Sequence, residues 1–207
     1  MTSIERVDAL RQSVEYIEAN SVPGDIVECG VWRGGSMLAV ALVLLRVNGV
    51  RRLWLYDTFS GMTPPGAEDK DFQGRSAAEW LRTEDPETSR FWGKSSLNDV
   101  QAAIAETGYP MELVEFVVGP VETTIPSRLP REIALLRLDT DWFSSTYHEL
   151  IHLWPRLTIG GILIIDDYGD WAGAKNAVDQ YFQEIGLIPF LHRIDGTGRL
   201  VIKTSNR

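Results

Sequence analysis

Four short apolar runs, each ending in glycine or aspartate, most constrain the fold of this 207-residue chain. The runs are DIVECG (25–30), RRLWLYD (51–57), IALLRLD (133–139) and GGILIIDD (160–167). Helix-like stretches separate them, such as SMLAVALVLLRV after the first run and STYHELIHLWPRL after the third. Strands that alternate with helices predict an open α/β sheet whose strands are mostly parallel.

The two ends of the chain extend this pattern. Near the amino terminus, apolar residues recur at intervals of three and four, at Ile4, Val7, Leu10, Val14 and Ile17. This spacing predicts an amphipathic helix over residues 3–20. The run MELVEFVVG (111–119) predicts a further strand, and PFLHRIDGTGRLVIK (189–203) predicts a closing hairpin that gives the sheet an antiparallel edge. No internal repeat or linker divides the chain, so we expect one domain over residues 1–207.

Residues 63–95 interrupt the alternation of strands and helices. Their composition mixes Pro, Gly and charged residues, with five large apolar anchors at Phe72, Trp80, Leu81, Phe91 and Trp92. A stretch this long between regular elements is usually functional or disordered. We interpret it as a partly helical lid over a site, and its aromatic residues suit either capture of a substrate or a homo-oligomer.

Composition and charge argue against several classes of protein. Apolar residues make up 44% and charged residues 24%, the balance of an ordinary soluble globular protein. No apolar stretch approaches the ~20 residues that span a bilayer, and the first ten residues do not resemble a signal peptide. We therefore expect a cytoplasmic protein without a membrane partner. The single cysteine, Cys29, excludes an internal disulfide, and the net charge of −9 disfavours a nucleic-acid partner.

The first candidate binding residues follow the first two runs, because ligands of open α/β sheets bind beyond the carboxyl ends of the strands. The loop ECGVWRGGS places Gly30, Gly34 and Gly35 where a strand turns into a helix, and glycine there lets a ligand approach the backbone. The spacing differs from the G-x-G-x-x-G dinucleotide fingerprint and suits a nucleoside that carries an amino acid. Asp57 ends the next run, where its carboxylate can accept hydrogen bonds from both ribose hydroxyls. The alternative is a Gly-rich turn beside a surface aspartate.

Aspartates follow the other two runs. Asp139 and Asp166 are 27 residues apart, about one strand–helix–strand unit. If the two strands are neighbours, their ends lie ~5 Å apart, so that Asp139, Asp166 and Asp167 converge, with Asp141 close by. Carboxylate oxygens suit a hard cation such as Mg²⁺ or Mn²⁺. The alternative makes these aspartates N-caps of the helices that follow.

The segment HELIH (148–152) matches the zinc-protease pattern H-E-x-x-H. Pro155 curtails its helix, the third histidine of the extended pattern is missing, and the sheet needs a crossover helix here. We therefore do not expect zinc chemistry. His148 is a candidate contact for a substrate. It is also the second candidate, after Asp141, for a base that takes a proton from that substrate.

Several motifs together resemble the macrocin O-methyltransferase family, from about Ile4 to Lys203. They are PGDIVECGVWRGGS, LYDTFSGM, LLRLDTDWFSSTYHEL and LWPRLTIGGILIIDDYGDWAGAKNAVDQYF. The resemblance implies a class I methyltransferase fold, a Rossmann-like seven-stranded sheet with helices on both faces. It also implies S-adenosylmethionine as methyl donor, Mg²⁺ as cofactor, and a sugar or glycosylated small metabolite as acceptor.

The resemblance assigns roles to individual residues. The implied cofactor-binding positions are Glu28, Gly30, Ser36, Asp57, Thr58 and Phe59. The implied metal-binding carboxylates are Asp139, Asp166 and Asp167. Asp141, the second acid of the run LDTD, matches the proposed general base of sugar-modifying members.

Two other classes of function fit some of the same residues. The run DTD (139–141) also fits the D-x-D motif with which metal-dependent glycosyltransferases or sugar-nucleotide-binding proteins hold a diphosphate. A non-catalytic protein that binds S-adenosylmethionine would keep the Gly-rich loop without methyl transfer.

Overall fold

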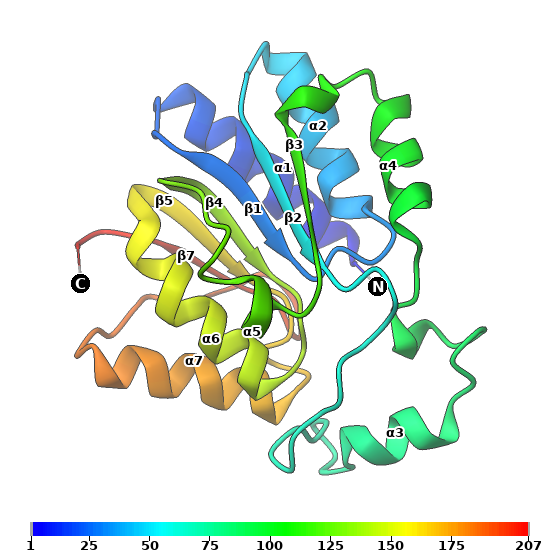
Figure 1. The fold of residues 1–207 in the computed structure, drawn as a ribbon. Helices are drawn as coiled ribbons and strands as arrows, with labels where there is room; N and C mark the ends of the chain where they lie inside the picture. Colours follow the sequence, from blue (N-terminus) through cyan, green and yellow to red (C-terminus); the bar gives the residue numbers. More distant parts are fainter. Residues whose placement is uncertain (1, 207) are drawn as a thin grey trace.

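The computed structural model describes residues 2–206 and has a seven-stranded sheet between two layers of helices (Figure 1). The strands are β1 (Asp25–Cys29), β2 (Leu53–Asp57), β3 (Val114–Val118), β4 (Ile133–Leu138), β5 (Leu157–Ile165), β6 (His192–Arg193) and β7 (Arg199–Ile202). Their order in the sheet is β3-β2-β1-β4-β5-β7-β6. Strands β1 to β5 pair in parallel, and β7 is antiparallel to both β5 and β6. The predicted parallel sheet with an antiparallel carboxyl-terminal edge is confirmed.

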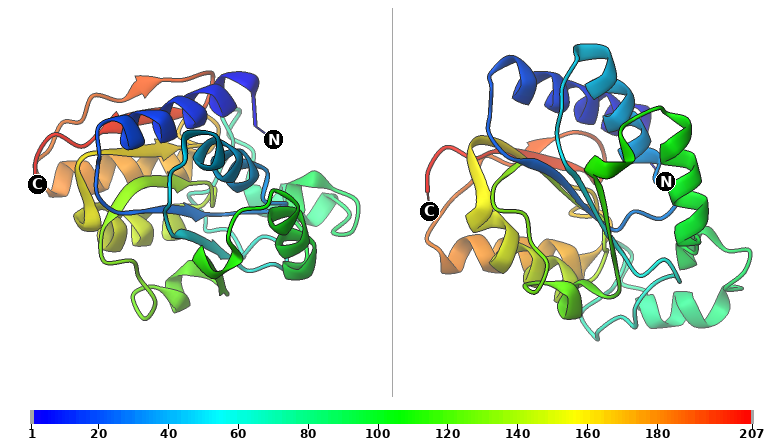
Figure 2. Two further views of the ribbon diagram at one scale, coloured as in Figure 1. Left: turned by 90° about the horizontal axis from the view of Figure 1, so that it is seen from above. Right: turned by 45° about the horizontal axis from the view of Figure 1, so that its top comes forward.

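Helices cover both faces of this sheet (Figures 1 and 2). One face carries α1 (Ile4–Ala19), α2 (Gly35–Val47) and α4 (Leu97–Glu106). The other carries α5 (Val121–Thr124), α6 (Phe143–Leu153) and α7 (Ala172–Glu184). A seventh helix, α3 (Ala77–Thr83), belongs to the 63–95 segment. None of the described helices is long and apolar enough to cross a membrane.

The inner strands are buried on both faces, which explains why their sequences read as nearly continuous apolar runs. In β1, Ile26 packs toward α1 and α2, whereas Val27, one residue later, packs toward α6 and α7. All six residues of β4 are buried, and one of them is Arg137. A charged side chain at such a position needs a partner inside the protein.

Three local features differ from the sequence prediction. Residues Met111–Leu113 form a 3₁₀ turn, η2, and β3 begins only at Val114. Strand β5 begins at Leu157 instead of Gly160, because α6 ends at Leu153 and the 3₁₀ turn η3 (Trp154–Arg156), which contains Pro155, replaces its predicted continuation. The four-residue helix α5 was not predicted, since it is too short to show a period.

The 63–95 segment is held beside the carboxyl ends of the strands by the buried Asp69. The Asp69 carboxylate accepts a hydrogen bond from the backbone N–H of Phe143, at the start of α6 (2.8 Å), and another from Gly66 (2.6 Å). Gly173 of α7 leaves room for it, because a Cβ there would lie 1.8 Å from an Asp69 oxygen. Asp69 therefore fastens the segment between the first turns of two helices.

A chain of aromatic rings forms the second attachment of this segment. Trp80 stacks on Phe91 with ring centroids 5.2 Å apart, and Phe91 meets Trp171 edge-on at 5.5 Å. Trp171 in turn meets Trp142 edge-on at 5.0 Å. The aromatic residues of the segment thus pack partly against α6 and α7, except Phe72, which is exposed.

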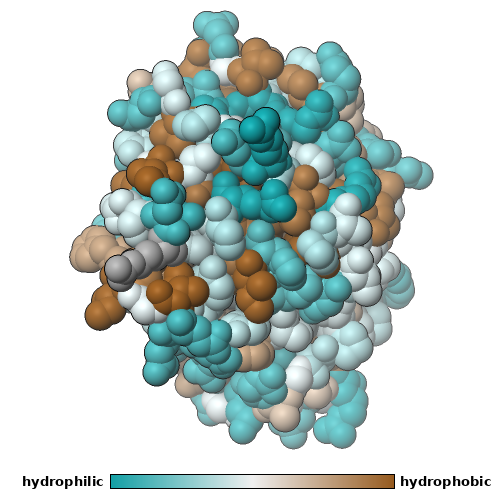
Figure 3. All heavy atoms as spheres, turned by 60° about the vertical axis from the view of Figure 1, so that its left-hand side comes forward, coloured by the Kyte–Doolittle hydropathy of each residue, from teal (hydrophilic) through white to brown (hydrophobic). Residues whose placement is uncertain are grey.

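The outer edge of the sheet bears on the predicted homo-oligomer, which stays a prediction. Ile188 and Phe190, just before the edge strand β6, are 98% and 83% exposed. An edge strand with exposed apolar neighbours favours pairing with another chain. On the face shown in Figure 3, apolar side chains lie in separate groups among hydrophilic ones, as on most protein surfaces.

Candidate active site

A pocket of about 340 Å³ opens beyond the carboxyl ends of β1, β2, β4 and β5. Aspartates line one part of it, at Asp57, Asp139, Asp141, Asp166, Asp167 and Asp170. Trp32, Phe91, Trp142 and Trp171 supply the aromatic part. Trp142 and Trp171 are largely buried in the core and also line this pocket.

A smaller pocket of about 60 Å³ adjoins the first, and the two share residues that include Gly30, Asp57 and Asp139. It is also lined by Thr58 and by the segment of residues 119–122, which follows β3 and begins α5. This segment could not be recognised as part of the site from the sequence, because VGPVE contains no recognisable motif. Its place at a strand end is the signal that could have identified it.

Strained backbone marks the strand ends around these pockets. Five described residues other than glycine have positive φ, and three of them follow strands of the site: Trp32 (48°), Phe59 (51°) and Asp141 (66°). Such conformations are costly for residues with a Cβ, and they cluster at functional sites. The clustering supports a functional role for this edge of the sheet.

Gly30 is required by the neighbouring strand. Its φ is 82°, and a Cβ at this position would lie 1.9 Å from the backbone oxygen of Asp139. From the sequence, we expected Gly30 to allow a ligand to approach the backbone. The structure shows that the close approach of the chain after β4 already demands it.

The predicted ribose ligand, Asp57, also organises the loop after β1. One oxygen accepts hydrogen bonds from the backbone N–H groups of Val31 (2.7 Å) and Trp32 (2.9 Å), and the other accepts from Phe59 (2.6 Å). A carboxylate offers about four acceptor positions, so these three bonds leave little capacity for two ribose hydroxyls. Thr58, the next residue, donates its hydroxyl to the Gly61 carbonyl (2.6 Å).

The predicted metal-binding carboxylates converge. Asp139, Asp166 and Asp167 each place one oxygen so that the three lie within 4.8 Å of one another. Burial and the neighbouring negative charges raise the pKa of Asp139 to about 6 and that of Asp141 to about 8, and they hold the pKa of Asp167 well above its usual value. A cation would relieve this repulsion. Hard oxygen donors at this spacing fit a divalent ion such as Mg²⁺.

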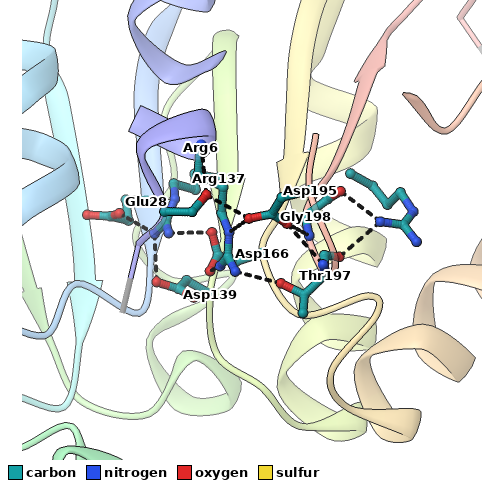
Figure 4. Close-up of polar contacts among 10 residues, drawn as sticks. Arg6, Glu28, Arg137, Asp139, Asp166, Asp195, Thr197 and Gly198 are labelled. Carbon is teal, nitrogen blue, oxygen red and sulfur yellow. Dashed lines mark hydrogen bonds and ion pairs between the residues drawn. The ribbon is translucent and has the colours of Figure 1, made fainter. Parts of the chain in front are cut away.

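The buried guanidinium of Arg137 bonds three acidic side chains at this end of the sheet (Figure 4). Its Nη1 donates to Glu28 Oε1 and to Asp139 Oδ2, both at 2.7 Å, and its Nη2 donates to Asp166 Oδ1 at 2.5 Å. The other oxygen of Glu28, Oε2, is buried without a partner among the described residues. Glu28 thus lies beneath the pocket, whereas Ser36, another predicted cofactor contact, lies half-buried in the first turn of α2.

A second arginine, Arg6 of α1, also bonds one of these acids, Asp166 (Figure 4). It bonds the second oxygen of Asp166, and it also donates to Asp195 Oδ2 (2.7 Å) and Thr197 Oγ1 (2.6 Å) in the turn between β6 and β7. Arg6 and Thr197 line the larger pocket. The first turn of the chain and its last hairpin therefore meet at Asp166.

The histidines of HELIH take no part in this cluster. His148 Nε2 lies 3.0 Å from the Ile125 carbonyl oxygen, and its ring is 4.5 Å from that of His152. Within residues 2–206, the acids at 139, 166 and 167 are the one group of three candidate metal ligands. The prediction that HELIH is no zinc site stays a prediction, and His148 is not among the residues that line either pocket.

Residues 1–202 match the family model described as Macrocin-O-methyltransferase (TylF). The chain belongs to the macrocin O-methyltransferase family. It is 36% identical over 204 residues to the 8-demethyl-8-(2,3-dimethoxy-alpha-L-rhamnosyl)-tetracenomycin-C 4'-O-methyltransferase of Streptomyces olivaceus. It is 33% identical over 204 residues to the demethyldecarbamoylnovobiocin O-methyltransferase of Streptomyces niveus. Both matches cover 96% of this chain and 73% of the relative.

A solved structure of the O-methyltransferase NovP superposes with a TM-score of 0.85 at 30% identity, covering 98% of this chain and 81% of that one. The resemblance found in the sequence is confirmed, and the protein is an O-methyltransferase with the class I methyltransferase fold. Family membership decides against the glycosyltransferase interpretation of the DTD run.

This macrocin O-methyltransferase family member also carries site residues that sequence reasoning missed, namely Arg6 and Arg137. Arg6 lies outside the quoted motifs, and Arg137 lies within LLRLDTDWFSSTYHEL without a role assigned to it there. Arg137 interrupts an otherwise apolar strand, and a charge within a strand buried on both faces was the available signal. Arg6 looks like an ordinary polar position of an amphipathic helix, and nothing in its neighbourhood in the sequence points to Asp166.

Glu28 leads to a prediction about pH and stability. Burial raises its pKa to about 8, from 4.5 in the unfolded chain, so between these values the folded protein binds the extra proton. Glu28 therefore contributes stability below about pH 4.5 that is lost as the pH rises toward 8, at up to about 1.4 kcal/mol per pH unit. We expect Glu28→Gln to lose less stability than the wild type between pH 5 and pH 8 in urea unfolding.

The control for this prediction is Glu115→Gln, which changes a partly exposed glutamate on β3 and should keep the wild-type difference between the two pH values. An unchanged difference in Glu28→Gln would mean that Glu28 does not take up the proton.

Proposed function

We propose that this O-methyltransferase uses S-adenosylmethionine and Mg²⁺ to methylate a hydroxyl of a sugar or glycosylated small metabolite. The observation that carries the proposal is the convergence of Asp139, Asp166 and Asp167 on a pocket that adjoins a second one at Gly30 and Asp57. Two relatives are named for methylation of a rhamnosyl-tetracenomycin and of demethyldecarbamoylnovobiocin, which supports this class of acceptor.

The smaller pocket is suited to the adenosine part of the donor. Asp57 and Thr58 line it together with the segment of residues 119–122. The Asp57 carboxylate keeps about one acceptor position for a ribose hydroxyl. Binding of the methionine part by Glu28, Gly30 and Ser36 stays a prediction. Binding of the nucleoside by Phe59 also stays a prediction. The unpartnered Glu28 Oε2 supports a cationic neighbour such as an α-ammonium group.

The larger pocket is suited to the acceptor. A bound Mg²⁺ ion would lower the pKa of an acceptor hydroxyl and fix its orientation, and Asp139, Asp166 and Asp167 would hold that ion. Asp141 lines the same pocket.

We expect Asp141 to receive the hydroxyl proton, because it lines the pocket that would hold the acceptor. S-adenosylmethionine, when bound, would supply the methyl group and leave as the thioether S-adenosylhomocysteine. The aromatic wall around Trp142 and Trp171 limits the access of water to the reacting atoms.

Calorimetric titration tests the cofactors. We expect the protein to bind S-adenosylhomocysteine, and Asp167→Asn to keep that affinity while its affinity for Mg²⁺ falls about 10-fold or more, since changes near metal ligands already cost about 10–100-fold. The matched control is Asp179→Asn on the exposed side of α7, which should keep both affinities. No binding of S-adenosylhomocysteine, with or without Mg²⁺, would refute the proposal.

Transfer of a labelled methyl group tests the acceptor. The probe is the rhamnosyl-tetracenomycin glycoside that appears in the name of the Streptomyces olivaceus relative. It is compared with its sugar-free aglycone and with a nucleotide-activated rhamnose. Label on the glycoside alone supports an attached sugar as acceptor. Label on the aglycone alone would mean that the acceptor hydroxyl belongs to the aglycone and not to a sugar.

A further inference from the structure

Glu149 is the member of HELIH that points into the protein, and the chemistry proposed above gives it no role. Its side chain on α6 is fully buried. Its carboxylate accepts hydrogen bonds from the Thr140 hydroxyl, at 3.0 Å and 3.2 Å for its two oxygens. Glu149 thus joins α6 to the loop after β4.

Thr140 stands between Asp139, a predicted metal ligand, and Asp141, the predicted base. Its carbonyl oxygen accepts a hydrogen bond from the backbone N–H of Trp142 at 2.7 Å. This bond closes a three-residue turn with Asp141 at its centre, where φ is 66°. A γ-turn with positive φ at its central residue is the rare and strained form.

A strained turn persists only when its surroundings hold it in place. On the far side of Asp141, the indole N–H of the buried Trp142 donates to the Thr63 carbonyl (2.9 Å). On the near side, the Ser145 hydroxyl approaches the Thr140 carbonyl only at 3.4 Å, a weak contact. The partly buried bond from Thr140 to Glu149 is therefore the main side-chain attachment of the residue before Asp141.

We infer that Glu149 is a positioning residue, which holds Thr140 through a partly buried hydrogen bond and so keeps the strained turn that presents Asp141 to the larger pocket. The catalytic consequence rests on the proposed function, in which Asp141 is the base. The effect on the turn itself does not depend on that function.

Amide hydrogen exchange of Trp142, followed by NMR, tests the effect on the turn. Thr140→Val removes the hydroxyl and keeps the shape, so we expect the Trp142 amide to exchange about 10-fold faster or more as the turn opens locally. Thr140→Ser keeps the hydroxyl and should restore the wild-type rate. The matched control is Thr158→Val, which removes a hydroxyl bonded to the Pro23 and Ile133 carbonyls at the opposite end of the sheet. Wild-type exchange in Thr140→Val overturns the inference.

Kinetics with labelled donor and the rhamnosyl-tetracenomycin probe test the catalytic consequence. We expect Thr140→Val to lower kcat about 10–100-fold, the usual effect of a small misplacement of a catalytic group. The affinity for S-adenosylhomocysteine and the KM for the acceptor should stay near wild type, and Thr140→Ser should recover kcat. A loss that falls on KM alone, or that Thr158→Val shares, overturns the positioning role.

Variants of Glu149 separate its hydrogen bond from its charge. Glu149→Gln keeps an acceptor oxygen and should keep most of kcat, whereas Glu149→Leu should match Thr140→Val. Equal losses in both Glu149 variants overturn the inference, and the Thr140 variants decide it if Glu149→Leu does not fold. A faster Trp142 exchange together with full turnover by Asp141→Asn would instead refute Asp141 as the base and leave the structural role intact.

Discussion

Asp141→Asn is expected to keep S-adenosylhomocysteine and Mg²⁺ binding and to lose methyl transfer by about 10²–10⁴-fold, the usual contribution of a general base. Asparagine has nearly the shape of aspartate and tolerates the positive φ at this position better than most residues. It should therefore keep the turn closed, while its amide cannot take a proton from the acceptor. Single-turnover transfer of labelled methyl measures the loss, and calorimetry measures the two affinities.

The control is Asp179→Asn on the outer side of α7, which makes the same chemical change at an exposed ion pair and should turn over like the wild type. Intact turnover by Asp141→Asn would place the base elsewhere. Loss of S-adenosylhomocysteine binding together with turnover would show that Asp141 serves the architecture of the site.

The positions of the acids could be predicted because they follow from sheet geometry. Apolar runs locate the strands, parallel strands share one carboxyl edge, and the residues after neighbouring strands must therefore meet there. Asp139, Asp166 and Asp167 needed no further information. The same reasoning placed Asp57 at the site, although the three backbone bonds that it accepts depend on the conformation of the loop after β1.

The partners of those acids could not be predicted, because they come from distant parts of the chain. Arg6 is 160 residues away from Asp166, and Arg137 meets Glu28 across 109 residues. Sequence periodicity shows whether a position is buried or exposed. It does not show which residue of opposite charge will lie beside it in the folded protein. The packing of the 63–95 segment has the same origin, since Asp69 finds its place only where α6 and α7 begin side by side.

Arg137→Leu is expected to destabilise the protein by about 3–5 kcal/mol, the usual cost of removing one partner from a buried ion pair. The variant leaves Glu28, Asp139 and Asp166 close together without the guanidinium that now bonds all three. Leucine fills part of the volume, so most of the loss should come from uncompensated charge. Urea unfolding at pH 7 measures the change.

The matched control is Arg52→Leu, which removes a partly exposed arginine paired with Glu115 and should cost less than about 1 kcal/mol. A pH series then distinguishes charge from packing. Loss of Arg137 raises the pKa of Glu28 and Asp139 further in the folded state, so protonation should restore part of the stability of Arg137→Leu at pH 5, and the deficit should grow toward pH 8. A deficit that is the same at both pH values would mean that a packing defect, and not the repulsion among the three acids, accounts for the loss.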